Sequence, residues 1–310
     1  MWIVATVWAG GCDSASKDSG GEGEFYVVAD DLDAGALLGA WTEGDELLCV
    51  GGTPGSGPGV IAHLNGEDLS LETVGDRTLW WIAGDDAGVW YAVGEAGTIL
   101  REEAGVRTVE SVPTAATLFG VEVEGTDVIA VGGSFTSEGS SGEVWRRRDG
   151  AWSLLAGDLP GAAFKVWDGW IVGDNAVFRL EGDELLPVDA EPGRLLTVRG
   201  RADDDVWAVG GTNAPDLRHW NGTSWAAVDP GPISQGLSGV WTAPGEDLFV
   251  AGNYGTAAFY HGDQWVEAEF VTSADLHAAW RFGDRPIWVG GDLFGGGGSA
   301  VILGYRSIGG

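Results

Sequence analysis

A short apolar run that ends in glycine recurs seven times along the chain, about 40 residues apart. The glycines that end these runs are Gly51, Gly94, Gly132, Gly173, Gly210, Gly252 and Gly290. A fixed period of this length is the signature of a repeat architecture. Four short strands with tight turns need about 40 residues, which is one blade of a β-propeller. The period therefore predicts seven copies of one small β-sheet.

The other features of each repeat predict four antiparallel strands. A strand with a spaced apolar pair, such as Leu195 and Val198, precedes the glycine strand, and an acidic turn such as 203–205 joins the two. A third strand follows, then a hairpin turn such as 221–222 and a fourth strand, often opened by Trp as at Trp225. The repeated tryptophans are expected to pack between neighbouring blades. The chain is therefore predicted to be all-β.

The first and last strands predict how the blades close into a ring. The seventh repeat begins at Leu276 and runs out near Arg306, after its third strand, whereas 24–30 is a lone strand before the first repeat. We therefore predict that 24–30 completes the last blade of a seven-bladed β-propeller of four-stranded antiparallel blades. Closure removes two exposed sheet edges. An open solenoid is the alternative.

Two segments carry a resemblance to known repeats. The segment 205–210, DVWAVG, and the segment 217–225, LRHWNGTSW, resemble the repeats of bacterial propeller lipoproteins. The unit is also similar to kelch repeats and to photosystem II assembly-factor propellers, as in 93–99, VGEAGTI. It departs from kelch repeats in its shorter period, and it lacks the Asp box of sialidase propellers. The resemblance implies the propeller fold and says almost nothing about activity.

The segment before the repeats predicts an anchored envelope protein. Residues 1–11 are apolar and end in small residues before Cys12, so they resemble a lipoprotein signal peptide. The resemblance implies acylation of Cys12, a flexible tether over 12–23 and a propeller domain over 24–310. Ala9 replaces the usual Leu, and the lack of a preceding basic residue suggests an upstream start. The predicted location is the outer membrane, cell surface or periplasm; a plain signal peptide and secretion are the alternative.

Charge excludes several partner classes. The formal net charge is −31, with 16 Lys and Arg against 47 Asp and Glu. Such a surface repels nucleic acid and anionic membrane surfaces, so we expect membrane contact through the lipid anchor alone and a soluble monomer. The run 146–148 is the one basic cluster, and we expect it on a solvated strand beside local acids. Cys49 aligns with small core residues and is expected to be buried and inert.

Motifs for cofactors and common catalytic sites are absent from the sequence. It contains no nucleophile elbow, no H-E-x-x-H, no C-x-x-C and no phosphate-binding loop. The Gly-rich loops at 51–55 and 295–298 do not precede helical patterns, so no cofactor is predicted. His63 and His219 occupy equivalent positions in different repeats and are expected to lie apart, so no shared metal site is predicted.

The turns between first and second strands predict a ring of carboxylates on one rim. Its members are Asp45, Asp86, Asp127, Asp204, Asp247 and Asp284. Calcium needs six to eight oxygens converging on one point, and no single loop has that spacing. We therefore expect these residues to form turns and solvate the rim. A cation-binding structural module is an alternative.

The loops after the repeat glycines are predicted to lie on the opposite rim and to hold any ligand site. Loops on a rigid scaffold usually carry function, and these vary most in length. The candidate residues are Glu95, Phe135, Asp174, Asn175, Asn213, Asn253, Tyr254, Asp292 and Phe294.

Taken together, these features predict a non-catalytic, envelope-anchored scaffold that is not an enzyme and binds a protein or a glycan through its variable rim. The alternative is a carbohydrate-active hydrolase or lyase at the central mouth. Such an enzyme needs two carboxyl groups at a defined separation, and Glu95, Asp174 and Asp292 are its candidates.

Overall fold

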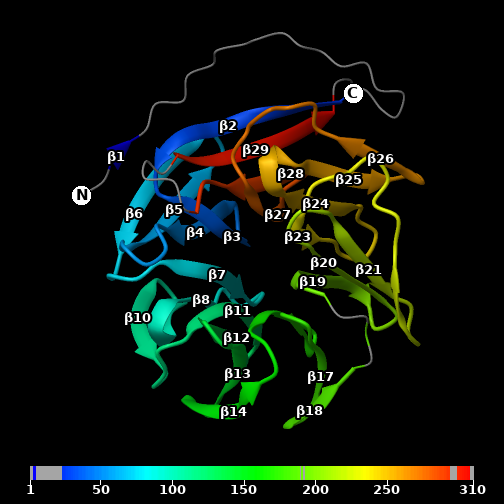
Figure 1. The fold of residues 1–310 in the computed structure, drawn as a ribbon. Coiled ribbons are helices and arrows are strands. Elements are labelled where there is room, and N and C mark those ends of the chain that lie inside the picture. Colours follow the sequence, from blue (N-terminus) through cyan, green and yellow to red (C-terminus); the bar gives the residue numbers. More distant parts are fainter. Residues whose placement is uncertain (1–2, 5–22, 189, 191–192, 294–298, 308–310) are drawn as a thin grey trace.

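Seven four-stranded antiparallel blades surround a central axis in the computed structural model, which describes residues 3–4, 23–188, 190, 193–293 and 299–307 (Figure 1). The innermost strands are β3 (Ala36–Glu43), β7 (Leu79–Gly84), β11 (Thr117–Glu124), β15 (Ala163–Trp167), β19 (Leu195–Ala202), β23 (Leu237–Trp241) and β27 (Leu276–Phe282). The second strands are β4 (Glu46–Gly52), β8 (Trp90–Gly94), β12 (Asp127–Thr136), β16 (Trp170–Gly173), β20 (Asp205–Gly210), β24 (Leu248–Gly252) and β28 (Arg285–Gly290).

The outer half of each blade is more exposed to solvent. The third strands are β5 (Gly59–Asn65), β9 (Thr98–Glu103), β13 (Gly139–Arg148), β17 (Val177–Glu181), β21 (Asp216–Trp220), β25 (Ala257–His261) and β29 (Ser299–Ser307). The outermost strands are β6 (Asp68–Val74), β10 (Val106–Ser111), β14 (Ala151–Leu159), β18 (Glu184–Pro187), β22 (Trp225–Ala227), β26 (Gln264–Glu267) and, in blade 7, β2 (Gly23–Asp33). The predicted all-β, seven-bladed propeller is confirmed.

The repeat glycines end the second strands because the chain approaches too closely there for a side chain. A Cβ on Gly94 would lie 2.2 Å from the carbonyl oxygen of Thr78, which precedes the innermost strand of the same blade. A Cβ on Gly290 would lie 2.0 Å from the carbonyl oxygen of Asp275. That carbonyl oxygen also accepts a hydrogen bond from the amide of the residue after the glycine, as from Gly291 at 2.9 Å. The glycines therefore recur once per blade because this close backbone contact recurs once per blade.

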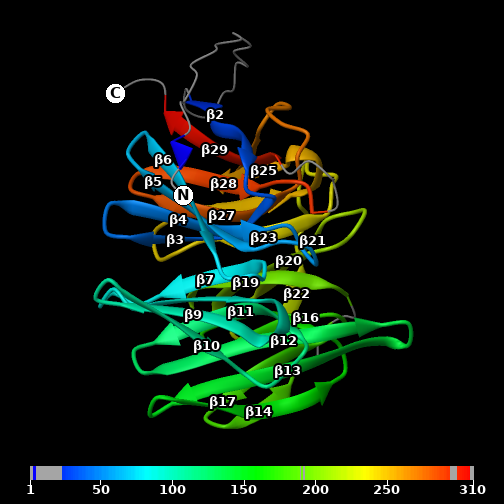
Figure 2. The same ribbon diagram turned by 90° about the vertical axis from the view of Figure 1, so that its left-hand side faces the viewer.

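The N-terminal strand closes the ring as predicted, over a longer span than 24–30. Strand β2 pairs antiparallel with β29, with Tyr26 opposite Gly304 and Ala29 opposite Ile302. Figure 2 shows β2 beside β29 at the outer edge of the last blade. The ring of Phe25 lies 5.2 Å from that of Trp288, so the closing strand also contributes to the core of blade 7.

Tryptophans pack between blades, as the sequence predicts. The rings of Trp41 in blade 1 and Trp280 in blade 7 lie 5.7 Å apart. Trp170 in blade 4 and Trp220 in blade 5 lie 4.8 Å apart. These contacts bury large apolar surfaces where adjacent blades meet. They join neighbouring sheets into one continuous ring.

The remaining structural predictions can be checked in the same blades. Cys49 is fully buried, and burial raises the pKa of its thiol to about 12, so it is inert as predicted. The arginines at 146–148 lie on β13 and pair with acids; Arg147, for example, contacts Glu110 at 3.2 Å. His63 and His219 lie in blades 1 and 5, each against carboxylates of its own blade.

Few elements lie outside the blades in the described residues. Strand β1 (Ile3–Val4) pairs with β6 at the outer edge of blade 1. Two short 3-10 turns, η1 (Glu95–Gly97) and η2 (Asn253–Gly255), follow repeat glycines. Within the described part of the chain, no helix has the length and apolar character needed to span a membrane.

Candidate functional site

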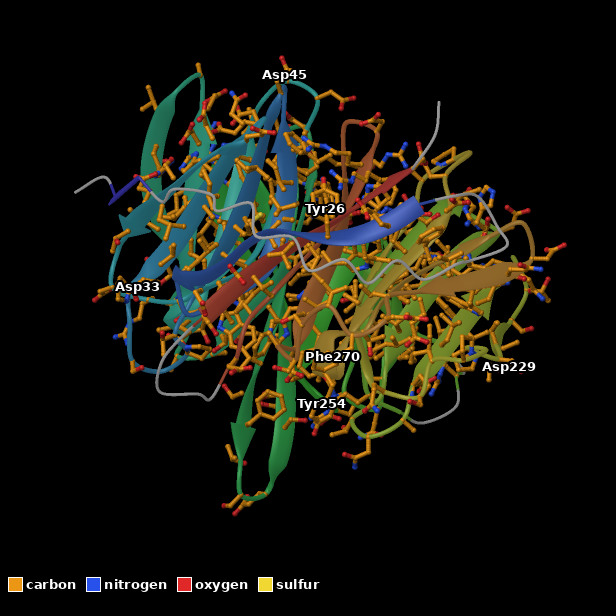
Figure 3. All side chains as sticks on the ribbon, turned by 90° about the horizontal axis from the view of Figure 1, so that it is seen from above. Tyr26, Asp33, Asp45, Asp229, Tyr254 and Phe270 are labelled. Atoms are coloured by element: carbon orange, nitrogen blue, oxygen red, sulfur yellow. The ribbon has the colours of Figure 1, made fainter. Side chains whose placement is uncertain are left out.

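The two rims of the ring differ in their side chains. We call the side with the loops after the repeat glycines and the connections between blades the loop rim. Figure 3 shows Tyr254 and Phe270 on this side, and Asp45 on the opposite side with the turns between first and second strands. The predicted division between acidic turns and variable loops therefore corresponds to two separate faces.

Two of the acidic turns are engaged by neighbouring side chains. A hydrogen bond from Arg146 lowers the pKa of Asp127, and the attraction of Arg146 and Arg148 acts in the same direction. Asp247 contacts Nδ1 of His261 at 3.0 Å. Among the described residues, no group of three or more His, Cys, Asp or Glu side chains is placed to hold a metal ion.

The exposed aromatic side chains gather on the loop rim. Phe135 is 52% exposed, Tyr254 is 70% exposed and Phe270 is 82% exposed. The other large hydrophobic residues that are exposed within the described chain are aliphatic and lie on β2 and the outer strands β10 and β14: Val27, Val106, Val109 and Leu154. An aromatic ring left in water at the rim of a rigid scaffold is typical of a contact surface for a partner.

The η2 turn holds Tyr254 outward. Tyr254 has a left-handed backbone (φ 53°), and its amide donates to Oδ1 of Asp275 at 2.9 Å. Asn253, beside it, is half-buried and donates from Nδ2 to the carbonyl oxygen of Thr212 at 3.1 Å. Asn253 is therefore a structural residue that joins blades 5 and 6, whereas Tyr254 is the one that projects. A left-handed conformation at a non-glycine residue is uncommon and marks a constrained site.

Asp174 is a link between three blades. Its Oδ2 accepts from the Ser140 hydroxyl at 2.7 Å, and its Oδ1 lies 3.2 Å from Nε of Arg194. Burial acts to raise the pKa of Asp174, but the hydrogen bonds from Ser140 and Arg194 outweigh burial, so its pKa lies below the usual value. Asn175, which is exposed, donates weakly to Asp174 from Nδ2 at 3.4 Å.

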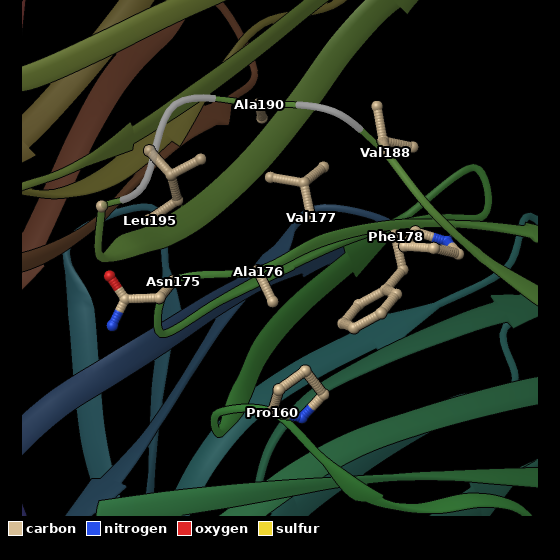
Figure 4. A pocket seen from close by; sticks show the side chains of 10 residues that line it. Pro160, Asn175, Ala176, Val177, Phe178, Val188, Ala190 and Leu195 are labelled. Atoms are coloured by element: carbon tan, nitrogen blue, oxygen red, sulfur yellow. The ribbon is translucent and has the colours of Figure 1, made fainter.

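An apolar hollow of about 160 Å³ lies next to Asn175 (Figure 4). Its walls include Val177, Phe178, Val188 and Leu195, from blade 4 and the start of blade 5. A second, more open hollow of about 410 Å³ lies between blades 1 and 2. It is more polar than the first hollow, and Glu95 lines it while accepting a hydrogen bond from the amide of Gly55 at 2.7 Å.

The three acidic candidates for a hydrolase come from three different blades. Glu95 lies on blade 2 against a loop of blade 1, and Asp174 lies on blade 4 against blades 3 and 5. Asp292 is exposed after the second strand of blade 7. Asn213 is also exposed, in the loop of blade 5, and Phe294 lies outside the described residues. The geometry therefore gives no support to the carboxylate pair predicted as an alternative.

Side chains at the central axis form a second candidate site, which the sequence patterns did not reveal. On each innermost strand a core residue lies opposite the repeat glycine, and the next residue falls at a register shift of the strand pair, where we place it toward the axis. These axial residues are Leu38, Trp80, Phe119, Phe164, Leu196, Ser238 and His277. Trp80, Phe119, Phe164 and Leu196 belong to one apolar cluster although they come from four consecutive blades. We call these four residues the axial cluster.

Phe135 connects the loop rim to the axial cluster. It lies on β12 beyond the repeat glycine, and its ring stacks on Phe164 with centroids 6.1 Å apart. It also meets the edge of Phe119 at 6.2 Å. The two candidate sites are therefore contiguous, with the exposed aromatic rim leading toward the axis.

Two basic groups, one buried and one partly buried, lie beside the axial cluster. Lys165 on β15 donates from Nζ to the carbonyl oxygen of Phe119 at 2.5 Å, and burial lowers its pKa to about 7. His277 on β27 donates from Nε2 to the carbonyl oxygen of Gly291 at 2.8 Å. Burial is the largest cause that lowers the pKa of His277, and the charge of Lys165 contributes in the same direction.

Comparisons with known proteins give matches among solved structures. No protein-family model matches the chain, and no curated protein sequence matches it. A catalytically inactive histidine-to-alanine variant of virginiamycin B lyase from Staphylococcus aureus, with quinupristin, has a TM-score of 0.71 at 12% identity, covering 93% of this chain and 100% of that one. YCF48 bound to D1 peptide has a TM-score of 0.65 at 14% identity, covering 92% and 97%.

A further similar structure is the WD40 β-propeller domain of Doa1, with a TM-score of 0.64 at 11% identity, covering 90% of this chain and 96% of that one. The chain is a β-propeller. At these identities the likeness extends to the fold alone.

The prediction that the chain is not an enzyme is contradicted by the match to virginiamycin B lyase, because a propeller of the same architecture supports a lyase. The prediction rested on the absence of contiguous motifs. A propeller brings together single residues from different blades at its axis, as with Trp80 and Leu196 here. A search for contiguous motifs cannot detect such a site.

Proposed function

We propose that this protein binds an exposed segment of a partner protein on its loop rim. The observation that carries the proposal is that, in the part of the chain that the structure describes, the exposed aromatic side chains all lie on this face: Phe135, Tyr254 and Phe270. Aromatic residues bury large areas at low entropic cost and are enriched in protein interfaces. A similar solved structure, YCF48, is bound to a peptide, which is consistent with this use of the fold.

The apolar hollow beside Asn175 favours a protein segment over a glycan, the other ligand class predicted from the sequence. Its walls are mainly aliphatic, with Val177, Val188 and Leu195 among them. A hollow of about 160 Å³ with this lining suits one aliphatic or aromatic side chain of a bound segment. Specific recognition of a sugar instead needs several side-chain donors and acceptors around the ring hydroxyls.

The proposal predicts that the rim aromatics carry binding and that exposed aliphatic residues elsewhere do not. The rim variant replaces Phe135, Tyr254 and Phe270 by Ser. The matched control replaces Val106, Val109 and Leu154 by Ser, since these are also exposed but lie on outer strands. Hot-spot residues cost about 2 kcal/mol or more each on truncation, so the rim variant should bind at least about 100-fold more weakly.

The measurement is selection of a random peptide library on the wild-type ring, followed by affinity determination for the enriched peptides by calorimetry. Retained affinity in the control variant shows that loss in the rim variant is local. Equal affinities of the rim variant and the wild type would contradict the proposal, and so would enrichment of no peptide family at all. Melting temperatures of both variants check that the ring is folded.

We further propose that the ring acts as a monomer held at the cell envelope by a lipid on Cys12. Cys12 lies outside the described residues, and the support comes from the apolar segment and small residues that precede it. Labelled palmitate should be incorporated into the wild type in its native host, and Cys12→Ser should lose all label and move to the soluble fraction. Label that persists in Cys12→Ser would contradict the anchor.

A further inference from the structure

Lys165 is a buried amine that forms no ion pair with any other described residue. The residue is only 9% exposed, and none of the carboxylates among the described residues forms an ion pair with it. Its Nζ donates to the carbonyl oxygen of Phe119 and lies 4.3 Å from the centroid of the Trp81 ring. An ammonium has three donors, and buried charges in proteins are normally paired. An anion would therefore stabilise the protonated side chain.

A glycine on the neighbouring blade leaves space for the Lys165 side chain. Gly120 occupies the equivalent position on β11, and a Cβ there would lie 2.9 Å from Cα of Lys165. The gap lets the strands approach and lets the ammonium reach past blade 3 to Trp81 on blade 2. The cation is thus held beside Phe119, at the edge of the axial cluster.

The axial cluster, which Lys165 contacts at Phe119, supplies one donor and apolar walls. Nε1 of Trp80 is buried and has no hydrogen-bond partner among the described residues, and its ring lies 5.0 Å from that of Phe119. His277 faces the axis from blade 7 but donates from Nε2 to a backbone carbonyl, which leaves Nδ1 as an acceptor. Phe119, Phe164 and Leu196 provide apolar surface.

We infer that a carboxylate on an apolar body enters the ring from the loop rim and pairs with the Lys165 ammonium, with the Trp80 indole as a second donor. A carboxylate supplies the negatively charged partner that the Lys165 ammonium lacks. It can accept hydrogen bonds from both the ammonium and the Trp80 indole. The apolar body would pack on the axial cluster under Phe135. The carboxylate belongs either to a free small acid or to a bound protein segment. The first source does not require the proposed partner binding.

The negative net charge of the protein opposes the binding of anions in general. At a net charge of −31, long-range forces oppose the approach of any anion, so binding depends on the local cation. A carboxylate paired with Lys165 in a desolvated site gains a strong, charge-assisted hydrogen bond. Pairing also raises the pKa of Lys165, because a nearby negative charge favours the protonated form.

The chain has only two lysines, Lys17 and Lys165, so each can be followed separately. The experiment labels the Cε carbons of lysine with 13C in the full chain and titrates pH with and without a probe. Lys17→Arg assigns the two resonances. The probes are isovalerate and its neutral analogue isovaleramide, then acetyl-alanyl-alanyl-phenylalanine with a free or an amidated C-terminus.

We expect a carboxylate probe to shift the Lys165 resonance and raise its pKa by about one to three units, while Lys17 is unchanged. The neutral analogues should have no effect, and Lys165→Met should lose binding measured by calorimetry. A response to isovalerate identifies free acids as sufficient, and a response to the peptide acid alone identifies a protein segment. The inference is overturned if neither acid moves the Lys165 resonance, or if acid and amide act equally. Loss of peptide-library binding in the rim variant is a separate result, so the two proposals fail independently.

Discussion

Deletion of residues 1–33 should lower the melting temperature by roughly 10–20 °C relative to deletion of residues 1–22. The longer deletion removes all of β2, which forms the outer strand of blade 7. Phe25, Val28 and Leu32 leave the core with it. At about 1.5–3 kcal/mol for each buried side chain, the loss is about 6 kcal/mol. The ladder of β29 also becomes an open edge, which favours self-association.

The shorter deletion is the matched control, since it removes β1 and the segment before β2 but leaves the ladder intact. Differential scanning calorimetry measures both melting temperatures, and size-exclusion chromatography detects association through the open edge. Similar melting temperatures for the two deletions would show that the ring is stable without its closing strand. The closure seen between Tyr26 and Gly304 would then be dispensable.

Between pH 7.5 and pH 10, the wild type should gain about 3 kcal/mol of stability relative to Lys165→Met. Burial lowers the pKa of Lys165 in the folded state to about 7, whereas its ordinary value is 10.5. In this window the unfolded chain holds the proton and the folded ring does not. Stability rises with pH wherever the unfolded state binds more protons, so the sign is positive. The Met variant lacks the titrating group and its curve lacks this rise.

Urea unfolding at a series of pH values measures the difference, and Lys17→Met is the control. Lys17→Met should run parallel to the wild type, because the segment 12–23 is predicted to be a tether. The window starts at pH 7.5 because the charge of Lys165 also lowers the pKa of His277, which titrates below it. Parallel curves for wild type and Lys165→Met would mean that Lys165 is solvated in the folded protein.

The fold could be predicted from sequence because each blade repeats the same backbone contact. Gly94 and Gly290 are required wherever the carbonyl before the innermost strand approaches the second strand, so they recur with the blade. The closing strand was predictable for a related reason, since the last repeat lacks a fourth strand and 24–30 matches one. Its extension to Asp33 was missed because the register shifts that continue the pairing leave no pattern.

The site was only partly predictable. Phe135 and Tyr254 were among the predicted candidates because they follow repeat glycines, and both are exposed on the loop rim. Phe270 was missed because it lies in a connection between blades, where no repeat position marks it. Lys165 was missed because its environment depends on Gly120 and Trp81 in two other blades. Aligning the innermost strands would have been the available signal, since Lys165 stands at a position where five of the other six blades have Gly, Ala or Thr.

The pairing of β2 with β29 also sets an order of events during biosynthesis. Glu24 and Arg306, which contact one another across this ladder, are 282 positions apart in the chain. Strand β2 is synthesised early and therefore stays unpaired until β29, near the end of the chain, has been synthesised. Contacts of such long sequence separation form slowly. We therefore expect chaperones that bind unpaired strands to bind β2 during synthesis.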